Sequence, residues 1–264
     1  MADELYYVYA FTWADCPIEA IGPAIDPRYP IEMVAGGSLA ALASRVGLDQ
    51  FDLGKLQAGT ADVEWLSQIA VRHNAIVGQA ARSGPVLPMR MGVLFRSRES
   101  LLERIAQCHS VTSDFLCRLG DRQEWGAAIY LDDARAERAP APAVNQPAAT
   151  PSASGAGANY LAQRRERDQA RRARKEQCRQ EIAAAEAALE SKADSFCPVR
   201  ALPSSLTGRR EKMMWNAAFL ISPSACPAWL ELADNLAQAL ADQGLLLETT
   251  GPWPAYHFCP EMTT

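Results

Sequence analysis

Apolar positions along the chain repeat with two periods, one typical of β-strands and one typical of amphipathic helices. Runs of aromatic and β-branched residues predict strands over residues 4–11, 31–35, 39–44, 124–131, 199–206, 212–221 and 245–249. Apolar spacings of three and four predict helices that begin near Asp62, Ser97, Tyr160 and Ser224. The second of these is predicted as one continuous helix that ends at Gly120. Residues 85–95, which prolines interrupt, are predicted to form an extended edge strand or loop.

The order of these elements predicts the fold class. The second half reads strand, helix, strand, strand, helix, strand, which is the ferredoxin-like plan of two helices on one face of an antiparallel sheet. The first half fits the same plan with a short or irregular first crossover. We therefore expect an α+β protein with two tandem ferredoxin-like (βαββαβ-type) domains, at residues 1–121 and 122–250, and a C-terminal tail at 251–264. Residues 134–158, rich in Ala, Pro, Ser and Gly, are expected to be a flexible insertion in the second domain.

Composition and charge restrict the class of protein further. The 264 residues carry a net charge of −5, which argues against a general nucleic-acid binder. No apolar run approaches the roughly 20 residues that span a bilayer, and the N-terminus lacks the pattern of a secretory signal, so a cytoplasmic protein is expected. The seven cysteines are odd in number and contain no CxxC pair, which favours free thiols over disulfides or a zinc ribbon.

One segment departs from this acidic balance. Residues 164–179 carry eight basic and three acidic side chains, a local balance of +5. An RNA-binding helix is one interpretation, but the basic-glycine-aromatic pattern of an RRM strand is missing. A solvated helix face, or a docking face for an acidic partner surface, is the favoured interpretation.

The residue types that carry catalysis or bind metals form no recognisable group. Phosphate-loop, nucleophile-elbow and zinc-helix motifs are absent from the sequence. His73 falls on the apolar stripe of its helix and is expected to be a hydrogen-bonded core or interdomain histidine. Cys108 and His109 are neighbours, about 100° apart on a helix, a poor arrangement for a nucleophile and its base. His257 and Cys259 offer two metal ligands, fewer than zinc needs. We therefore predict no catalytic residue, no metal and no cofactor.

Two segments carry residues that suit contacts with a partner. Arg90 lies among apolar residues and two prolines, where an arginine normally pairs with a carboxylate or with backbone carbonyls, so structural anchoring is the plain interpretation. Near the C-terminus, prolines stiffen an arm whose aromatic side chains need a surface to cover. The arm packs back on its own chain or grips a neighbour. The predicted partner-binding residues are Arg90, Trp253, Tyr256 and Phe258.

Four segments together resemble the gas vesicle protein family GvpF/GvpL, namely VLPMRMGVLF at 86–95, EWGAAIYL at 124–131, NYLAQRRERD at 159–168 and TGPWPAYHF at 250–258. YYVYAF at 6–11 and the stretch from Trp65 to His73 are similar to it too, so the resemblance covers essentially the whole chain. It implies a non-enzymatic accessory or minor structural protein of gas vesicles, the gas-filled protein shells that give prokaryotes buoyancy. Implied partners are the small hydrophobic shell protein and other accessory proteins, with no nucleic acid and no membrane among them. The implied fold is a ferredoxin-like domain, a second α+β domain and a tail.

Three other functions are weighed against this one. A ferredoxin-like or ACT-like module that binds a small regulatory ligand would be stabilised thermally by that ligand. An enzyme that uses its cysteines would lose activity on Cys259→Ser. RNA binding by the arginine-rich helix would weaken as salt is added.

Overall fold

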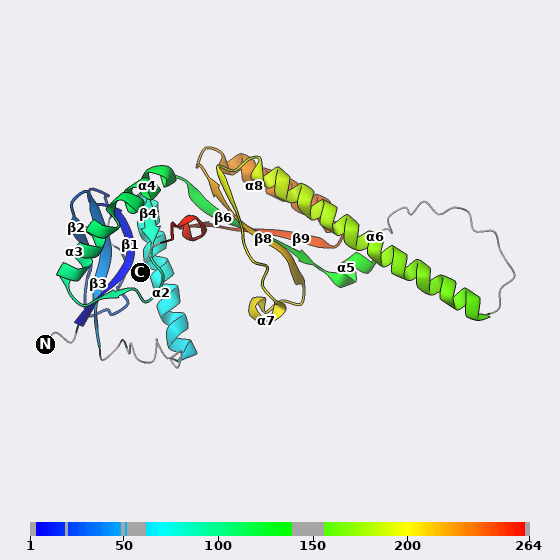
Figure 1. The fold of residues 1–264 in the computed structure, drawn as a ribbon, viewed down its shortest axis with the longest axis horizontal. Coiled ribbons are helices and arrows are strands. Elements are labelled where there is room, and N and C mark those ends of the chain that lie inside the picture. Colours follow the sequence, from blue (N-terminus) through cyan, green and yellow to red (C-terminus); the bar gives the residue numbers. More distant parts are fainter. Residues whose placement is uncertain (1–3, 19–20, 49–50, 52–61, 139–155, 262–264) are drawn as a thin grey trace. The chain divides into compact units, whose positions relative to one another are not determined.

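The computed structural model describes the chain except for residues 1–3, 19–20, 49–50, 52–61, 139–155 and 262–264 (Figure 1). Contacts divide it into two compact units. Unit 1 comprises residues 1–124 together with 252–264, and unit 2 comprises residues 125–251. The chain therefore passes between the units twice, and its C-terminal residues return to unit 1.

Unit 1 is built on a sheet of order β2-β3-β1-β4, with β5 also paired to β1. Its strands are β1 (Glu4–Trp13), β2 (Ile31–Gly36), β3 (Leu39–Gly47), β4 (Val86–Pro88) and β5 (Leu94–Phe95). β1 pairs antiparallel with β3 and with β4. β2 and β3 also pair antiparallel, as a hairpin that turns through Gly37, whose φ is 75°. The strands predicted over residues 4–11, 31–35 and 39–44 are confirmed.

Among the described residues of unit 1, three helices pack on this sheet, α2 (Val63–Ser83), α3 (Arg98–Gln107) and α4 (His109–Leu119). The Asp62 side chain caps α2 by accepting from the Glu64 N–H, and Ser97 with Ser100 forms a capping box on α3. Figure 1 shows α2 on one side of the sheet and α3 with α4 on the other. All eight inner residues of β1 are buried, as expected for a strand covered on both faces. The expected arrangement of both helices on one face is therefore wrong for this unit.

Unit 2 contains a sheet of order β7-β8-β6-β9. Its strands are β6 (Gln123–Leu131), β7 (Ser195–Pro198), β8 (Lys212–Ile221) and β9 (Leu245–Trp253), and β7 pairs antiparallel with β8. The helices are α5 (Asp133–Arg138), α6 (Ala156–Glu190), α7 (Ser204–Thr207) and α8 (Cys226–Ala241). α6 and α8 pack together, and Trp229 of α8 is fully buried with its indole N–H donated to the Leu189 carbonyl at 3.2 Å.

Two predictions about single elements are wrong, and a third lies mostly outside the described residues. The helix over 97–120 is two helices, because the Cys108 backbone adopts φ −97° and ψ 10° between α3 and α4. The strand over 199–206 lies instead at 195–198, because Pro203 initiates the short helix α7, whose Leu206 is 71% exposed. The expected insertion at 134–158 is helical at both ends, in α5 and α6, and its residues 139–155 lie outside the described part of the chain.

Candidate functional site

A buried hydrogen-bonded chain fixes the proline-interrupted segment between β4 and β5. The Tyr7 hydroxyl lies 2.9 Å from His73 Nδ1, and His73 Nε2 lies 3.0 Å from the Met89 carbonyl. The Gly92 N–H donates to the same tyrosine hydroxyl at 3.2 Å. Because a carbonyl can only accept, His73 carries its proton on Nε2, and the tyrosine donates to Nδ1. Burial lowers the pKa of His73, so the neutral ring suits this chain. The predicted core histidine is confirmed.

Arg90 sits at the tip of the segment that this chain holds. Met89 before it is buried at 8% exposure, whereas Arg90 is exposed and Met91 is 40% exposed. Among the residues that the structure describes, Arg90 makes no hydrogen bond or ion pair. The plain interpretation of Arg90 as a buried anchor is therefore wrong: the anchors are the backbone groups of its neighbours, and they leave its guanidinium in solvent.

The C-terminal tail folds back onto unit 1. A short 3-10 helix (Tyr256–Phe258) follows β9. The Tyr256 hydroxyl donates to Asn74 Oδ1 of α2 at 3.0 Å, and the Tyr256 ring packs on the unit 1 core. The Cys259 thiol points at the Pro88 carbonyl, 3.8 Å away. The arm was predicted either to pack on its own chain or to grip a neighbour. Tyr256 packs on its own chain.

A buried carboxylate holds the tail from its other side. Glu124, which is 3% exposed, accepts the His257 N–H at 2.9 Å and lies 2.6 Å from His257 Nδ1. Burial raises the pKa of Glu124, while the hydrogen bonds from His257 oppose that rise. His257 therefore acts with Glu124 as a clasp between the tail and the start of β6.

The thiol in this cluster is held in its protonated form. Burial raises the pKa of Cys259 to about 12, the Glu124 carboxylate adds to the rise, and Arg90 opposes it. Since the thiolate is the nucleophile, a cysteine with this pKa is poorly suited to covalent catalysis at neutral pH. In the described residues no three or more His, Cys, Asp or Glu side chains form a group that could hold a metal ion.

The structure thus brings together some of the predicted partner-binding residues. Arg90 lies close enough to Cys259 for the guanidinium to affect the thiol, and Tyr256 lies within the same tail cluster. Phe258 is partly buried, and Trp253 at the end of β9 is 51% exposed. Of the predicted residues, Arg90 and Trp253 are therefore exposed, whereas Tyr256 packs on the core of unit 1.

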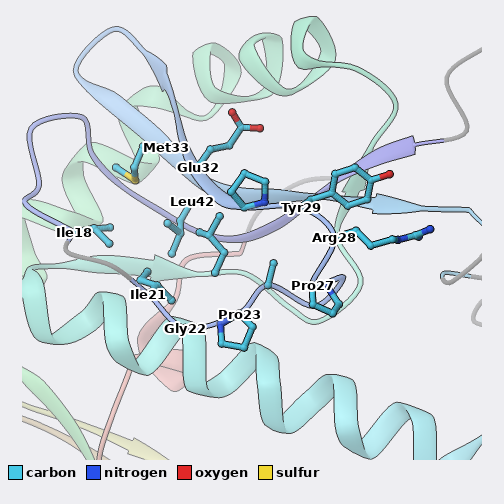
Figure 2. A pocket seen from close by; sticks show the side chains of 13 residues that line it. Ile18, Ile21, Gly22, Pro23, Pro27, Arg28, Tyr29, Glu32, Met33 and Leu42 are labelled. Carbon is cyan, nitrogen blue, oxygen red and sulfur yellow. The ribbon is translucent and has the colours of Figure 1, made fainter.

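A cavity that the sequence analysis missed lies elsewhere in unit 1. It is an open pocket of about 660 Å³ between the crossover after β1 and the hairpin of β2 and β3 (Figure 2). Ile18 and Ile21 line it from the crossover, and Met33 and Leu42 from the strands. The prolines of the crossover were the signal for it, because they keep this segment out of a helix that would cover the sheet.

An ion pair fixes the same crossover. Asp26 is 4% exposed, and its carboxylate accepts from the Arg28 guanidinium at 2.6 Å and from the Gly47 N–H at 3.2 Å. The hydrogen bonds from Arg28 lower the pKa of Asp26 to about 2. Asp26 therefore ties the crossover to the end of β3.

Unit 2 carries the basic segment found in the sequence. All of it lies in α6, where residues 162–169 are exposed and Arg179 pairs with Glu176 at 3.1 Å. Among the positions of α6 whose burial is described, Cys178 is the first buried residue. In the described part of the chain, no helix is both long enough and apolar enough to cross a bilayer.

These features define an α+β protein of two antiparallel sheets. Residues 5–260 match the family model described as gas vesicle synthesis protein GvpL/GvpF, and the chain belongs to that family. It is 27% identical over 259 residues to gas vesicle protein L of Streptomyces sp. (strain CB03234), covering 97% of this chain and 93% of that one.

Two solved structures share its fold. The crystal structure of the gas vesicle protein GvpF from Anabaena sp. PCC7120 superposes with a TM-score of 0.69 at 16% identity, over 98% of both chains. GvpF from Microcystis aeruginosa superposes with a TM-score of 0.65 at 15% identity, over 97% of this chain and 99% of that one. The resemblance inferred from the sequence motifs is confirmed.

Proposed function

We propose that this chain is a non-enzymatic accessory or minor structural protein of gas vesicles, which takes part in their assembly by binding the small hydrophobic shell protein and other accessory proteins. The observation that carries the proposal is the family match, which runs from residue 5 to residue 260. The protein would work in the cytoplasm, at the growing vesicle.

A physical need supports this role. A nascent shell of small apolar subunits exposes surfaces that aggregate unless another protein covers them. The exposed side chains of Arg90, Met91 and Trp253 offer one charged and two apolar contacts on a unit whose backbone is firmly held. We assign the shell-protein contact to these exposed side chains and to the tail residues Tyr256 and Phe258.

The finer architecture belongs to the same proposal. In both sheets the first strand lies between the third and the fourth, the order of a ferredoxin-like domain. We infer two tandem ferredoxin-like domains, at 1–121 and 122–250, in the first of which an irregular crossover replaces one helix, and a tail at 251–264.

The experiment is a pull-down of the tagged full-length protein from cells that express a gas vesicle gene cluster. Arg90→Glu and Trp253→Ala are compared with Arg98→Glu and Val71→Ala, two changes at exposed positions of the same unit. We expect each of the first pair to lower recovery of the shell protein at least threefold, and the second pair to leave it unchanged. If full-length protein recovers no vesicle component, the proposed function is wrong; equal recovery by all four variants would place the contact elsewhere.

The cavity favours one other function, a small regulatory ligand bound by unit 1. Its volume of about 660 Å³ falls in the range of small-molecule sites. A thermal-shift screen of amino acids and nucleotides tests it, because a ligand that binds only the native state raises the melting temperature. Ile21→Trp, which fills the cavity, should abolish such a shift.

A further inference from the structure

A row of basic side chains follows the exposed half of α6. Its members are spaced by three and four residues, which places them on one side of the helix. All of them are exposed, and in the part of the chain that the structure describes none of them makes an ion pair. The basic row consists of Arg164, Arg167, Arg171 and Lys175.

The basic row continues a stripe that is apolar further along the same helix. With the same spacing of three and four, the next positions are Cys178, Ile182, Ala185 and Leu189, which belong to the core of unit 2 or pack against it. Figure 1 shows α6 running beyond the end of the sheet of its unit. The side of α6 that covers the sheet therefore becomes basic where the helix leaves the sheet, so this side is built for contact along its whole length.

The exposed half of α6 is unfavourable by itself. Arg167 and Arg171, and Arg171 and Lys175, are like charges four residues apart, which repel each other on a helix. Asp168 offsets part of this repulsion. A helix that is polar all round gains little from burial, so a contact from outside the chain that neutralises these charges would stabilise it.

We propose that the basic row binds an acidic helix of another protein, with carboxylates spaced by three and four residues along one of its sides. Charge complementarity supports this partner, and three of the four members are arginines, whose planar guanidinium pairs with a carboxylate through two hydrogen bonds. The inference goes beyond the proposed function and does not rest on it.

The observations favour a protein over a nucleic acid. Acidic residues Glu166 and Glu176 lie on other sides of the same stretch, so the positive charge is not continuous around the helix. Tyr160 is the one aromatic residue among positions 160–179, whereas single-stranded RNA is bound by several stacking side chains. RNA is therefore the competing outcome of the test.

The experiment measures binding of the full-length protein by fluorescence anisotropy in 50 mM and 300 mM NaCl, salt concentrations chosen to vary screening. The probes are a designed alanine-rich helical peptide with glutamates spaced four and three, a scrambled peptide of equal composition, and an oligouridylate of equal charge. Arg167→Gln/Arg171→Gln removes the centre of the basic row. Arg165→Gln/Arg172→Gln is the matched control, since it removes the same charge from the same helix roughly a third of a turn away.

We expect the spaced peptide to bind more tightly than the scrambled peptide and the RNA, and its affinity to fall as salt rises. The row variant should lose at least tenfold in affinity and the control less than threefold, with helicity by circular dichroism unchanged in both. Equal losses in the two variants, tighter binding of the RNA, or no binding of the spaced peptide would each overturn the proposal. So would salt-sensitive self-association that the row variant abolishes, because the occupant would then be a second copy of this chain.

Discussion

At the scale of the residue, His73 decides how the segment around Arg90 is held. Its two ring nitrogens are both used, one by Tyr7 and one by the Met89 carbonyl, within a strand-helix interface that excludes water. A buried group that loses its partner costs about 1–3 kcal/mol. The position of the exposed Arg90 therefore depends on a histidine that never reaches the surface.

The first prediction removes this ring. His73→Leu leaves the Tyr7 hydroxyl and the Met89 carbonyl short of a partner and should lower the free energy of unfolding by about 2–4 kcal/mol. Urea unfolding at pH 7 measures it. The control is His109→Leu, since His109 is exposed and bonds only the Ser38 hydroxyl among the described residues, at 2.9 Å. A loss below 1 kcal/mol for His73→Leu would show that the hydrogen-bonded chain is dispensable.

Asp26 makes a prediction about acid. Its pKa in the folded protein is about 2, below the ordinary 3.8, so the unfolded chain binds the proton first as pH falls. The stabilisation is full above pH 4 and is lost between about pH 4 and pH 2. Asp26→Asn should therefore cost about 2 kcal/mol at pH 6, and the difference from the parent should shrink by pH 3.

Urea unfolding at the two pH values checks this prediction. Asp114→Asn, at an exposed position of α4, serves as the control for a general effect of removing one carboxylate. A penalty for Asp26→Asn that is the same at pH 6 and pH 3 would mean that the ion pair with Arg28 contributes no pH dependence.

At the scale of the element, the sequence predicted best where independent signals agree. The helix that begins near Asp62 was predicted correctly, because a capping residue and the apolar spacing both indicate it. The break at Cys108 could not be predicted, since the stripe of Leu101, Ile105, Phe115 and Leu119 continues on both sides of it. The 199–206 error arose because Leu202 and Leu206 counted as strand residues, and both are exposed.

At the candidate site, single residues could be predicted from the local sequence, but contacts between distant parts of the chain could not. Arg90 and the tail aromatics were named from their local sequence, but the contact between the tail and the segment before Arg90 was not, because Cys259 and Pro88 are 171 positions apart. Nor could the sequence reveal Glu124 as the clasp on His257, since a glutamate at the start of a strand reads as solvent-exposed.

Two glycines of unit 2 allow a matched test of how its elements fit. Both have a positive φ, 67° at Gly208 and 76° at Gly244. A Cβ at Gly208 meets open space, whereas at Gly244 it comes within 2.5 Å of the Ala136 backbone nitrogen in α5. Gly208→Ala should cost about 1–2 kcal/mol from backbone strain alone. Gly244→Ala should cost clearly more, because α5 must also shift.

Thermal unfolding of the two variants measures the difference. Because both glycines lie in unit 2, the two costs are read from the same unfolding transition. Equal costs at Gly208 and Gly244 would indicate that α5 moves away without loss, and that the contact between α5 and the turn after α8 does not stabilise unit 2.

At the scale of the whole molecule, the two units are connected through β6 and β9. The unit boundaries fall after Glu124 and after Gly251, so the last residues of β9 and the tail belong to unit 1 although they follow unit 2 in the sequence. The C-terminal residues therefore complete unit 1, whose other residues come from the N-terminal part of the chain. The stability of unit 1 therefore depends on residues at both ends of the protein.

The last prediction follows from this closure. A variant that ends at Trp253 keeps β9 complete but loses the Tyr256 bond to Asn74, the Cys259 contact and the bonds from His257 to Glu124. Hydrogen exchange should then become faster in α2, β4 and the start of β6, and stay unchanged in α8 and β8. Faster exchange in α8 and β8 would contradict the assignment of the tail to unit 1. A longer chain that ends at Tyr256 restores the Tyr256 bond to Asn74 but not the contacts of His257 and Cys259. Because these contacts act on different elements, this chain should recover protection in α2 but not at Glu124.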